Sequence, residues 1–268
     1  MIHNFFEFKY HKIVKSYIEN ETDYHFIEQL GVGSYGIAYL IEESKSQKKY
    51  VLKRMKLKHR NNKKLRHKFQ QEITMLKEMG LPRVPSVISH GELYDTPFYI
   101  MDYIDGQTFE QAIFRTGKSF SVEQSLNITK ELLEIVVDFH KKGIVHRDLR
   151  IPNILLKEDA LHIIDFGLAA YIKENVDLEK IDNPKKLENH ISDLYFIGHF
   201  LLFLLYSNFT PSERKERSWQ EELQLPPEVE NYIERLLLIR PAFSSAEEAL
   251  AALSVESAEK GPCQNNIW

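Results

Sequence analysis

The residues whose types and spacing suggest chemistry are two acids and an amide in the middle of the chain. Asp148 and Asn153 lie in one short stretch, His-Arg-Asp-Leu-Arg-Ile-Pro-Asn, and Asp165 follows in a separate Ile-Ile-Asp-Phe-Gly block. One carboxylate can orient a hydroxyl group, while an amide and a second carboxylate supply the oxygen ligands that Mg²⁺ prefers. Phosphoryl transfer requires this combination of a base and metal-binding oxygens.

A glycine-rich loop, a lysine and a glutamate precede these residues. The loop has the pattern G-x-G-x-x-G over residues 31–36, which alone also occurs in dinucleotide-binding folds and in simple turns. Short β-like runs flank it and no helix opens at Gly36, so we expect a hairpin whose backbone N–H groups approach phosphate oxygens. Lys53 lies on the second run, and Glu72 lies within a predicted helix.

In order and spacing, these blocks resemble the protein kinase family, specifically the eukaryotic-like (Hanks-type) serine/threonine kinases in a compact form. The resemblance runs from about Gly31 to Leu253. It implies that Lys53 contacts the phosphates of ATP and pairs with Glu72 through a charge-assisted hydrogen bond. It also implies that Asp148 is the catalytic base and that Arg150, in place of the usual lysine, neutralises the γ-phosphate. Asn153 and Asp165 are the two implied Mg²⁺ ligands.

The same resemblance predicts an ATP site. Met101 is the expected gatekeeper, and the next three residues supply the hinge backbone for adenine. Ala38 and Val51 stand where the family usually has valine and alanine, and because the two changes exchange sizes we expect a repacked adenine site of unchanged volume. The predicted nucleotide contacts are Gly31, Val32, Gly33, Ser34, Tyr35, Gly36, Ala38, Val51, Lys53, Met101, Asp102, Tyr103, Ile104 and Leu155.

The segment between Asp165 and Asp193 is shorter than the family's activation segment. Residues 166–191 contain no serine and no threonine, and the chain has no Ala-Pro-Glu. Tyr171 is the only hydroxyl residue of this stretch, so Arg147, which in the family often binds the loop phosphate, has no obvious phosphorylated partner nearby. We expect acids to replace that charge permanently. The candidates are Glu174, Asp177, Glu179 and Asp182, with Glu179 or Glu188 as the partner of the late Arg240, and Asp193 as the residue that supports the catalytic loop.

The hydrophobic pattern predicts two lobes. β-like runs at 35–41, 50–57 and 98–104 accompany helices over 1–18 and 69–79, and the rest is mainly helical apart from a loop over 212–222. Ser121 and Gln124 predict a capping box at the start of one long helix. We expect an α+β, bilobal protein-kinase-like fold, with a small antiparallel N-lobe sheet and one main helix before a larger helical C-lobe. The first helix should pack through Phe6, Tyr10, Ile13 and Tyr17. The expected divisions are an extension over 1–23, a catalytic domain over 24–254 (N-lobe 24–101, hinge 102–106, C-lobe 107–254) and a tail over 255–268.

Composition excludes several other classes. The 268 residues are 43% hydrophobic, which supports a core, and 28% charged, which excludes a membrane-embedded body. A single cysteine, Cys263, excludes an internal disulfide and a cysteine-based zinc site. With no secretory segment, and with its longest apolar run (194–206) too short to cross a bilayer, the chain is expected to be cytoplasmic and without a membrane partner.

The expected activity is transfer of the γ-phosphate of Mg-ATP to a serine or threonine hydroxyl of a protein substrate. The shortened segment after Asp165 leaves two alternatives open, a small-molecule kinase and a nucleotide-binding regulatory module with little catalysis. Nine basic residues over 53–68 form either a solvated loop or a docking site for an acidic partner. Nucleic acid is not expected there, since no aromatic residues are interleaved.

Overall fold

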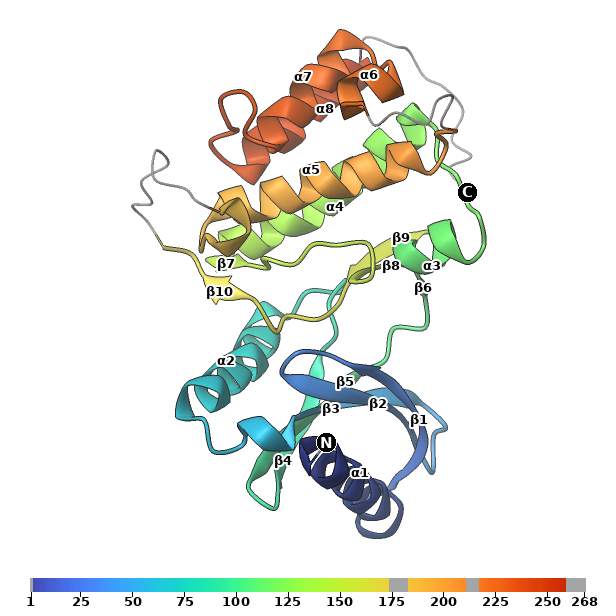
Figure 1. Ribbon diagram of the computed structural model, residues 1–268, viewed down its shortest axis with the longest axis vertical. Coiled ribbons are helices and arrows are strands. Elements are labelled where there is room, and N and C mark those ends of the chain that lie inside the picture. The colour runs from blue at the N-terminus through green and yellow to red at the C-terminus, as the bar shows by residue number, and fades with distance from the viewer. Residues whose placement is uncertain (1, 174–182, 211–216, 259–268) are drawn as a thin grey trace. The chain divides into compact units, whose positions relative to one another are not determined.

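The fold is described by a computed structural model over residues 2–173, 183–210 and 217–258, with side chains described for 6–173, 183–210 and 217–253. The chain divides into two compact units, Met1–Asp105 and Gly106–Trp268, which are taken in turn (Figure 1). No described helix is long and apolar enough to cross a membrane.

The first unit contains a five-stranded antiparallel sheet. Its spatial order is β1-β2-β3-β5-β4, so β3 is central and pairs with both β2 and β5. The strands are β1 (Tyr24–Val32), β2 (Gly36–Glu43), β3 (Lys49–Met55), β4 (Val87–Leu93) and β5 (Thr96–Asp102).

The register sorts the residues of β3 onto two faces. Lys53 pairs with Ala38 on β2 and with Tyr99 on β5, while Val51 pairs with Met101. Paired residues of antiparallel strands point the same way, and successive residues of a strand point opposite ways. The side chains of these five residues therefore share one face, and the residues between them on each strand occupy the other.

Two helices belong to the first unit. α1 (Ile2–Glu21) packs on the sheet through Tyr10, Val14 and Ile18, which are spaced four residues apart and are almost fully buried. α2 (Lys63–Met79) begins six residues earlier than predicted, because the Asn62 side chain accepts a hydrogen bond from the backbone N–H of Leu65 and caps the helix. A short 3₁₀ turn, η1 (Leu57–His59), joins β3 to α2.

The predicted apolar stripe of the first helix is partly wrong. Tyr10 is buried as predicted, but Phe6 and Ile13 are 53% and 40% exposed. The buried stripe runs instead through Val14 and Ile18, one residue along from the predicted positions. Because the pattern contains apolar residues on more than one side of the helix, its periodicity alone does not identify the buried side.

The second unit is mainly helical. Its helices are α3 (Phe109–Phe114), α4 (Val122–Lys141), α5 (His190–Tyr206), α6 (Trp219–Leu223), α7 (Pro227–Leu236) and α8 (Ala246–Ala258), with a 3₁₀ turn η3 (Pro184–Lys186). Short strands form two further sheets, β10-β7 and β6-β8-β9, from β6 (Gln107–Thr108), β7 (Ile144–Val145), β8 (Ile154–Lys157), β9 (Ala160–Ile163) and β10 (Ala170–Tyr171).

Helix α4 is the centre of this unit and packs against α5 and α8. It begins with a capping box, as predicted, in which Ser121 and Gln124 each bond the other's backbone N–H. Gly198 lets α5 approach α7 closely, since a β-carbon there would lie 2.8 Å from the Leu237 side chain. The loop prediction over 212–222 is wrong at its end, where α6 begins at Trp219 after a second capping box.

Candidate active site

The predicted pair in the first unit is formed. Lys53 Nζ lies 2.7 Å from Glu72 Oε1, which joins β3 to α2. The Tyr99 hydroxyl donates to the same oxygen at 3.0 Å. Glu72 is almost fully buried, and its negative charge is balanced by the lysine and solvated by the tyrosine. Sequence reasoning missed Tyr99, although its position two residues before Met101 places it on the same face of the sheet.

The glycine-rich segment is a tight hairpin between β1 and β2, as predicted. The N–H of Gly33 bonds the carbonyl of Gly36 at 3.0 Å. A β-carbon at Gly36 would lie 2.9 Å from the carbonyl oxygen of Arg54, so only glycine fits there, whereas one at Gly31 would contact nothing within 4 Å. The exposed Val32 leaves the turn open to solvent. The hairpin therefore offers accessible backbone to a ligand.

The strand end at the predicted hinge is fixed by Asp102. Its carboxylate accepts hydrogen bonds from Lys48 Nζ at 3.1 Å and from the Ser86 N–H at 3.3 Å. Its own N–H donates to the Ser86 carbonyl at 3.0 Å. The N–H of Asp102 is thus engaged by the Ser86 carbonyl and is not offered to a nucleotide base.

In the second unit, Asp148 is held from two sides. Arg150 donates from Nε to Oδ1 at 2.6 Å and from its terminal nitrogen to Oδ2 at 3.1 Å, a bidentate pair. Asn153 Nδ2 donates to Oδ2 of Asp148 at 2.8 Å and to its carbonyl at 2.9 Å. The hydrogen bond to Asp148 raises the pKa of the Arg150 guanidinium, so that side chain remains charged.

The predicted metal ligands Asn153 and Asp165 are linked through their backbones. The Ile164 N–H donates to the Asn153 carbonyl at 3.0 Å, and Asp165 follows it in a left-handed conformation with φ 61°. Because Asn153 Nδ2 faces Asp148, its Oδ1 is the atom offered to a cation. An amide oxygen and a carboxylate are hard ligands, and they fit Mg²⁺.

The buried side chain of Asp193 holds the catalytic loop by accepting hydrogen bonds from its backbone. It accepts backbone N–H bonds from His146 at 2.9 Å and Arg147 at 2.6 Å, and lies 3.0 Å from His140 Nε2. Burial opposes its ionisation, but the bonds from His140 and the backbone hold the pKa of its carboxyl below the ordinary value. These bonds hold Arg147 in its left-handed conformation, with φ 65°.

His146 links this loop to the Asp165 segment. Its Nδ1 accepts from the Asp148 N–H at 3.2 Å, and its Nε2 lies 3.3 Å from the Ile164 carbonyl. The ring packs edge-on against Phe166, with centroids 4.6 Å apart. Burial lowers the pKa of His146, so the ring is neutral and donates from Nε2.

Comparison with known proteins identifies the family. The protein kinase domain model matches residues 24–189. The probable serine/threonine-protein kinase YbdM of Bacillus subtilis is 34% identical over 82% of this chain and 84% of that protein. The chain belongs to the protein kinase family. It is an ATP-dependent protein kinase with the predicted α+β fold.

Two further likenesses support this assignment. The protein kinase PrkC of Bacillus subtilis is 25% identical over 68% of this chain, which spans 30% of PrkC. The crystal structure of the PknI kinase domain from Mycobacterium tuberculosis superposes with a TM-score of 0.65 over 88% of this chain and 96% of that one, at 19% identity. The second likeness shows the fold.

Arg147 of this kinase already has partners. Its guanidinium donates to the carbonyls of Leu168 at 3.2 Å and Lys186 at 2.8 Å, and lies 3.6 Å from the Glu188 carboxylate. Glu188 also binds Lys173 Nζ at 2.6 Å. The four acids predicted to replace a loop phosphate, at 174, 177, 179 and 182, lie outside the described residues. Among the described ones, Glu188 is the acid nearest this guanidinium.

The prediction that Glu188 pairs with Arg240 is wrong. Arg240 instead forms an ion pair with Glu234 on α7, six residues earlier in the chain. Glu234 also accepts a hydrogen bond from Gln220 at 3.3 Å. The late arginine of this kinase is thus anchored within the helical region of the second unit. The other predicted partner, Glu179, lies outside the described residues.

The basic run 53–68 is not simply a solvated loop, which corrects one of its two interpretations. It comprises the end of β3, the turn η1 and the start of α2. Lys53 and Arg54 are ion-paired, and Arg66 pairs with Glu92. The exposed basic residues of this run are Lys58, Lys63, Lys64 and Lys68, and Lys56 and Arg60 are partly exposed.

Proposed function

We propose that this kinase transfers the γ-phosphate of ATP to a serine or threonine hydroxyl of a protein substrate. The observation that carries the proposal is the ion pair between Lys53 and Glu72, supported by Tyr99. A lysine held in this way keeps its charge and a fixed direction, which suits it to bind phosphate oxygens. The open hairpin over 31–36 supplies backbone donors for the same phosphates.

Asp148 is the proposed base, which orients the substrate hydroxyl and accepts its proton. Both of its oxygens accept hydrogen bonds from Arg150, but a carboxylate has about four lone-pair sites, so a site remains for the hydroxyl. Arg150 is more than half exposed, so its guanidinium is open to the γ-phosphate group of a bound substrate. We assign it the neutralisation of charge on that group.

Mg²⁺ is the proposed metal, held by Asn153 Oδ1 and Asp165. When bound, such an ion neutralises phosphate charge. The protein's own contribution is to orient these ligands. The Asp148 contacts fix the Asn153 amide, and the Gly167 N–H donates to Asp165 Oδ1 at 3.3 Å.

Activity independent of loop phosphorylation is part of the proposal. A phosphate in the family's activation segment binds the arginine of the catalytic loop. Here the two terminal nitrogens of Arg147 already donate to the carbonyls of Leu168 and Lys186, with Glu188 nearby. We also propose that an acidic segment of the substrate docks on the exposed cations of residues 56–68, because complementary charge raises the encounter rate.

The decisive assay uses the full chain with γ-labelled ATP and Mg²⁺, tested alone, with an acidic protein, with a basic protein and with a metabolite pool. Label on serine or threonine of a protein supports the proposal. Label only on a metabolite indicates a small-molecule kinase, and nucleotide binding without transfer indicates a regulatory module. Asp148→Asn should abolish transfer and spare ATP binding. Persistent transfer by that variant would refute the assigned base.

A further inference from the structure

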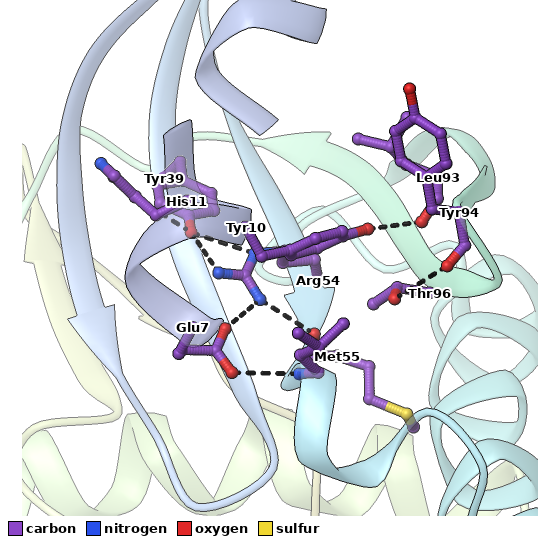
Figure 2. A network of polar contacts seen from close by, with 10 residues as sticks. Glu7, Tyr10, His11, Tyr39, Arg54, Met55, Leu93, Tyr94 and Thr96 are labelled. Atoms are coloured by element: carbon purple, nitrogen blue, oxygen red, sulfur yellow. Dashed lines mark hydrogen bonds and ion pairs between the residues drawn. The ribbon is translucent and has the colours of Figure 1, made fainter. Parts of the chain in front are cut away.

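Arg54 is the most deeply buried charged side chain described in the first unit. It follows Lys53 on β3 and is 1% exposed. Since successive strand residues point to opposite faces, Lys53 points toward α2 and Arg54 toward α1. Figure 2 shows the guanidinium enclosed by residues of α1, β2 and its own strand. Its side chain takes no part in the phosphoryl-transfer chemistry assigned to Lys53 and Asp148.

Each nitrogen of this guanidinium has a partner. Nε and one terminal nitrogen donate to the Tyr39 hydroxyl at 3.0 and 2.8 Å, and the other terminal nitrogen donates to Glu7 and to the Met55 carbonyl. The Tyr10 ring lies against it, with its centroid 4.9 Å from the Arg54 Cζ atom. A buried arginine whose three nitrogens are all hydrogen-bonded to fixed partners is held in one orientation.

Tyr39 is a neutral acceptor in this cluster. Burial raises the pKa of its hydroxyl, so it keeps its proton. The hydroxyl lies 3.3 Å from Nδ1 of His11 on α1, and burial together with the charge of Arg54 lowers the pKa of that histidine. A neutral His11 accepts the tyrosine proton while the tyrosine oxygen accepts the two arginine bonds. The cluster therefore connects α1 to β2 and β3.

Glu7 connects the same cluster to the α2 side. One of its carboxylate oxygens pairs with Arg54, and the other accepts the backbone N–H of Leu57 at 3.1 Å. Leu57 is the first residue of η1, which leads into α2 and so to Glu72. The N–H of the preceding residue, Lys56, donates to the Tyr35 carbonyl of the hairpin at 2.8 Å. One side chain on α1 thus fixes the place where β3, the hairpin and the α2 connection meet.

We propose that α1 is a built-in activating element of this kinase, with Glu7 and Arg54 as positioning residues for Lys53. Holding the Arg54 side chain fixes the rotation of β3 about its axis, and with it the direction of Lys53 toward Glu72. Holding the Leu57 N–H fixes the start of the segment that carries Glu72. A merely apolar contact would pack α1 without setting this register. The inference rests on the nucleotide-binding role proposed for Lys53.

Glu7→Gln is the sharpest variant because it keeps the shape of the side chain. Its single amide oxygen can accept from Arg54 or from Leu57 but not from both, and its NH₂ group opposes the second donor. Glu7→Ala removes both acceptors. We expect kcat/KM for ATP to fall about threefold in the first and about tenfold in the second, while KM for the protein substrate stays unchanged.

Val14→Ala is the matched control. Val14 lies on the same helix and is buried against the same sheet, but the described structure shows no polar contact of it with β3 or η1. Its thermal midpoint should fall by at least as much as that of Glu7→Gln. Measured at a temperature where all variants are folded, its kcat/KM for ATP should match the wild type within about twofold.

A double variant separates stability from positioning. Glu7→Leu with Arg54→Met replaces the buried ion pair by apolar groups of similar length, which commonly preserves stability. The Leu57 N–H still loses its acceptor, so we expect a folded kinase with weakened ATP binding. Faster hydrogen exchange of the Leu57 amide should accompany the loss.

The outcomes distinguish this inference from the proposed function. If the wild type phosphorylates protein and Glu7→Ala does so with unchanged kcat/KM for ATP, the positioning role is refuted and the function stands. If Val14→Ala loses as much ATP efficiency as Glu7→Ala, α1 contributes stability alone and the inference also fails. If the wild type transfers no phosphate, the proposed function fails. The affinity for a non-hydrolysable ATP analogue in the same variants then decides the inference.

Discussion

Two arginines, one in each unit, stand next to a residue of the chemistry and are held in opposite ways. Arg54 follows Lys53 and has a 1% exposed side chain that contacts a carboxylate and a tyrosine. Arg147 precedes Asp148, has a 17% exposed side chain, and donates to two backbone carbonyls with Glu188 at a longer distance. In the first unit the arginine is held by a charged side chain from a helix far away in the sequence. In the second unit the arginine is held mainly by backbone carbonyl groups.

The two arginines differ in which part of the chain supplies the groups that hold them. Both carbonyls that hold Arg147 come from segments inside the stretch that matches the kinase domain model, residues 24–189. Glu7, which holds Arg54, lies before that stretch. The second unit therefore holds its arginine with residues inside the matched stretch, whereas the first unit uses a residue outside it. Mutation should affect the two arginines unequally.

The largest expected effect is on stability at Arg54. Arg54→Ala leaves Glu7 and Tyr39 without their partner in a buried space, which should cost about 3 kcal/mol of unfolding free energy. Arg147→Ala frees two carbonyls near the surface and should cost about 1 kcal/mol. Urea unfolding followed by far-ultraviolet circular dichroism measures both. Equal losses would contradict the contrast between the two arginines.

Tyr39→Phe should have the next largest effect. The ring remains in the core, but Arg54 loses the acceptor of two hydrogen bonds, at a cost of about 2 kcal/mol. Tyr24→Phe is a suitable control, because the described contact of that residue is a ring contact with Tyr50. A loss of similar size in the control would show that the hydroxyl of Tyr39 contributes nothing specific.

Acidification should destabilise the second unit through His146. Burial lowers its pKa from 6.5, so below pH 6.5 the unfolded chain binds a proton that the folded chain does not. Stability is therefore complete above about pH 6.5 and falls as the pH drops further, by about 1 kcal/mol between pH 7.5 and 5.5. Thermal unfolding over that range measures it. A midpoint that rises on acidification would contradict the neutral ring.

The smallest expected effect is at the shortened segment after Asp165. Tyr171 is the only hydroxyl residue between 166 and 191, so Tyr171→Phe removes the last phosphorylatable group there. Turnover should change by less than about twofold, because the partners of Arg147 are backbone carbonyls and a carboxylate. Phosphatase treatment of the wild type is the control. A large loss in either experiment would show that this kinase is activated by loop phosphorylation.

Motif-bearing elements could be predicted from the sequence because local spacing determines them. The hairpin over 31–36, the capped helix starting after Ser121 and the pair of Lys53 with Glu72 agree with the structure. The predicted start of α2 is too late, because residues 63–68 are mostly charged and show no apolar repeat that would indicate a helix. Its signal is the capping residue Asn62.

Contacts between long side chains of distant segments could not be predicted. Arg54 looked like one cation of a solvated run, but Glu7, 47 residues away, makes it a core residue. Arg240 was assigned to acids of the shortened segment, whereas Glu234 lies within its own helical region. In each case the partner is determined by how a helix packs against a neighbouring element. The spacing of residues along the sequence does not indicate that packing.

The close approach of Gly36 to the Arg54 carbonyl limits which substitutions this position can accept during evolution. A β-carbon at position 36 would push on the backbone of the residue whose side chain α1 holds, whereas positions 7 and 54 are coupled directly through their side chains. Relatives that keep an arginine at position 54 should keep an acid at position 7. In lineages that have lost the first helix, an apolar residue should have replaced the arginine, while glycine should remain at position 36, because the atom that a β-carbon would meet there belongs to the backbone.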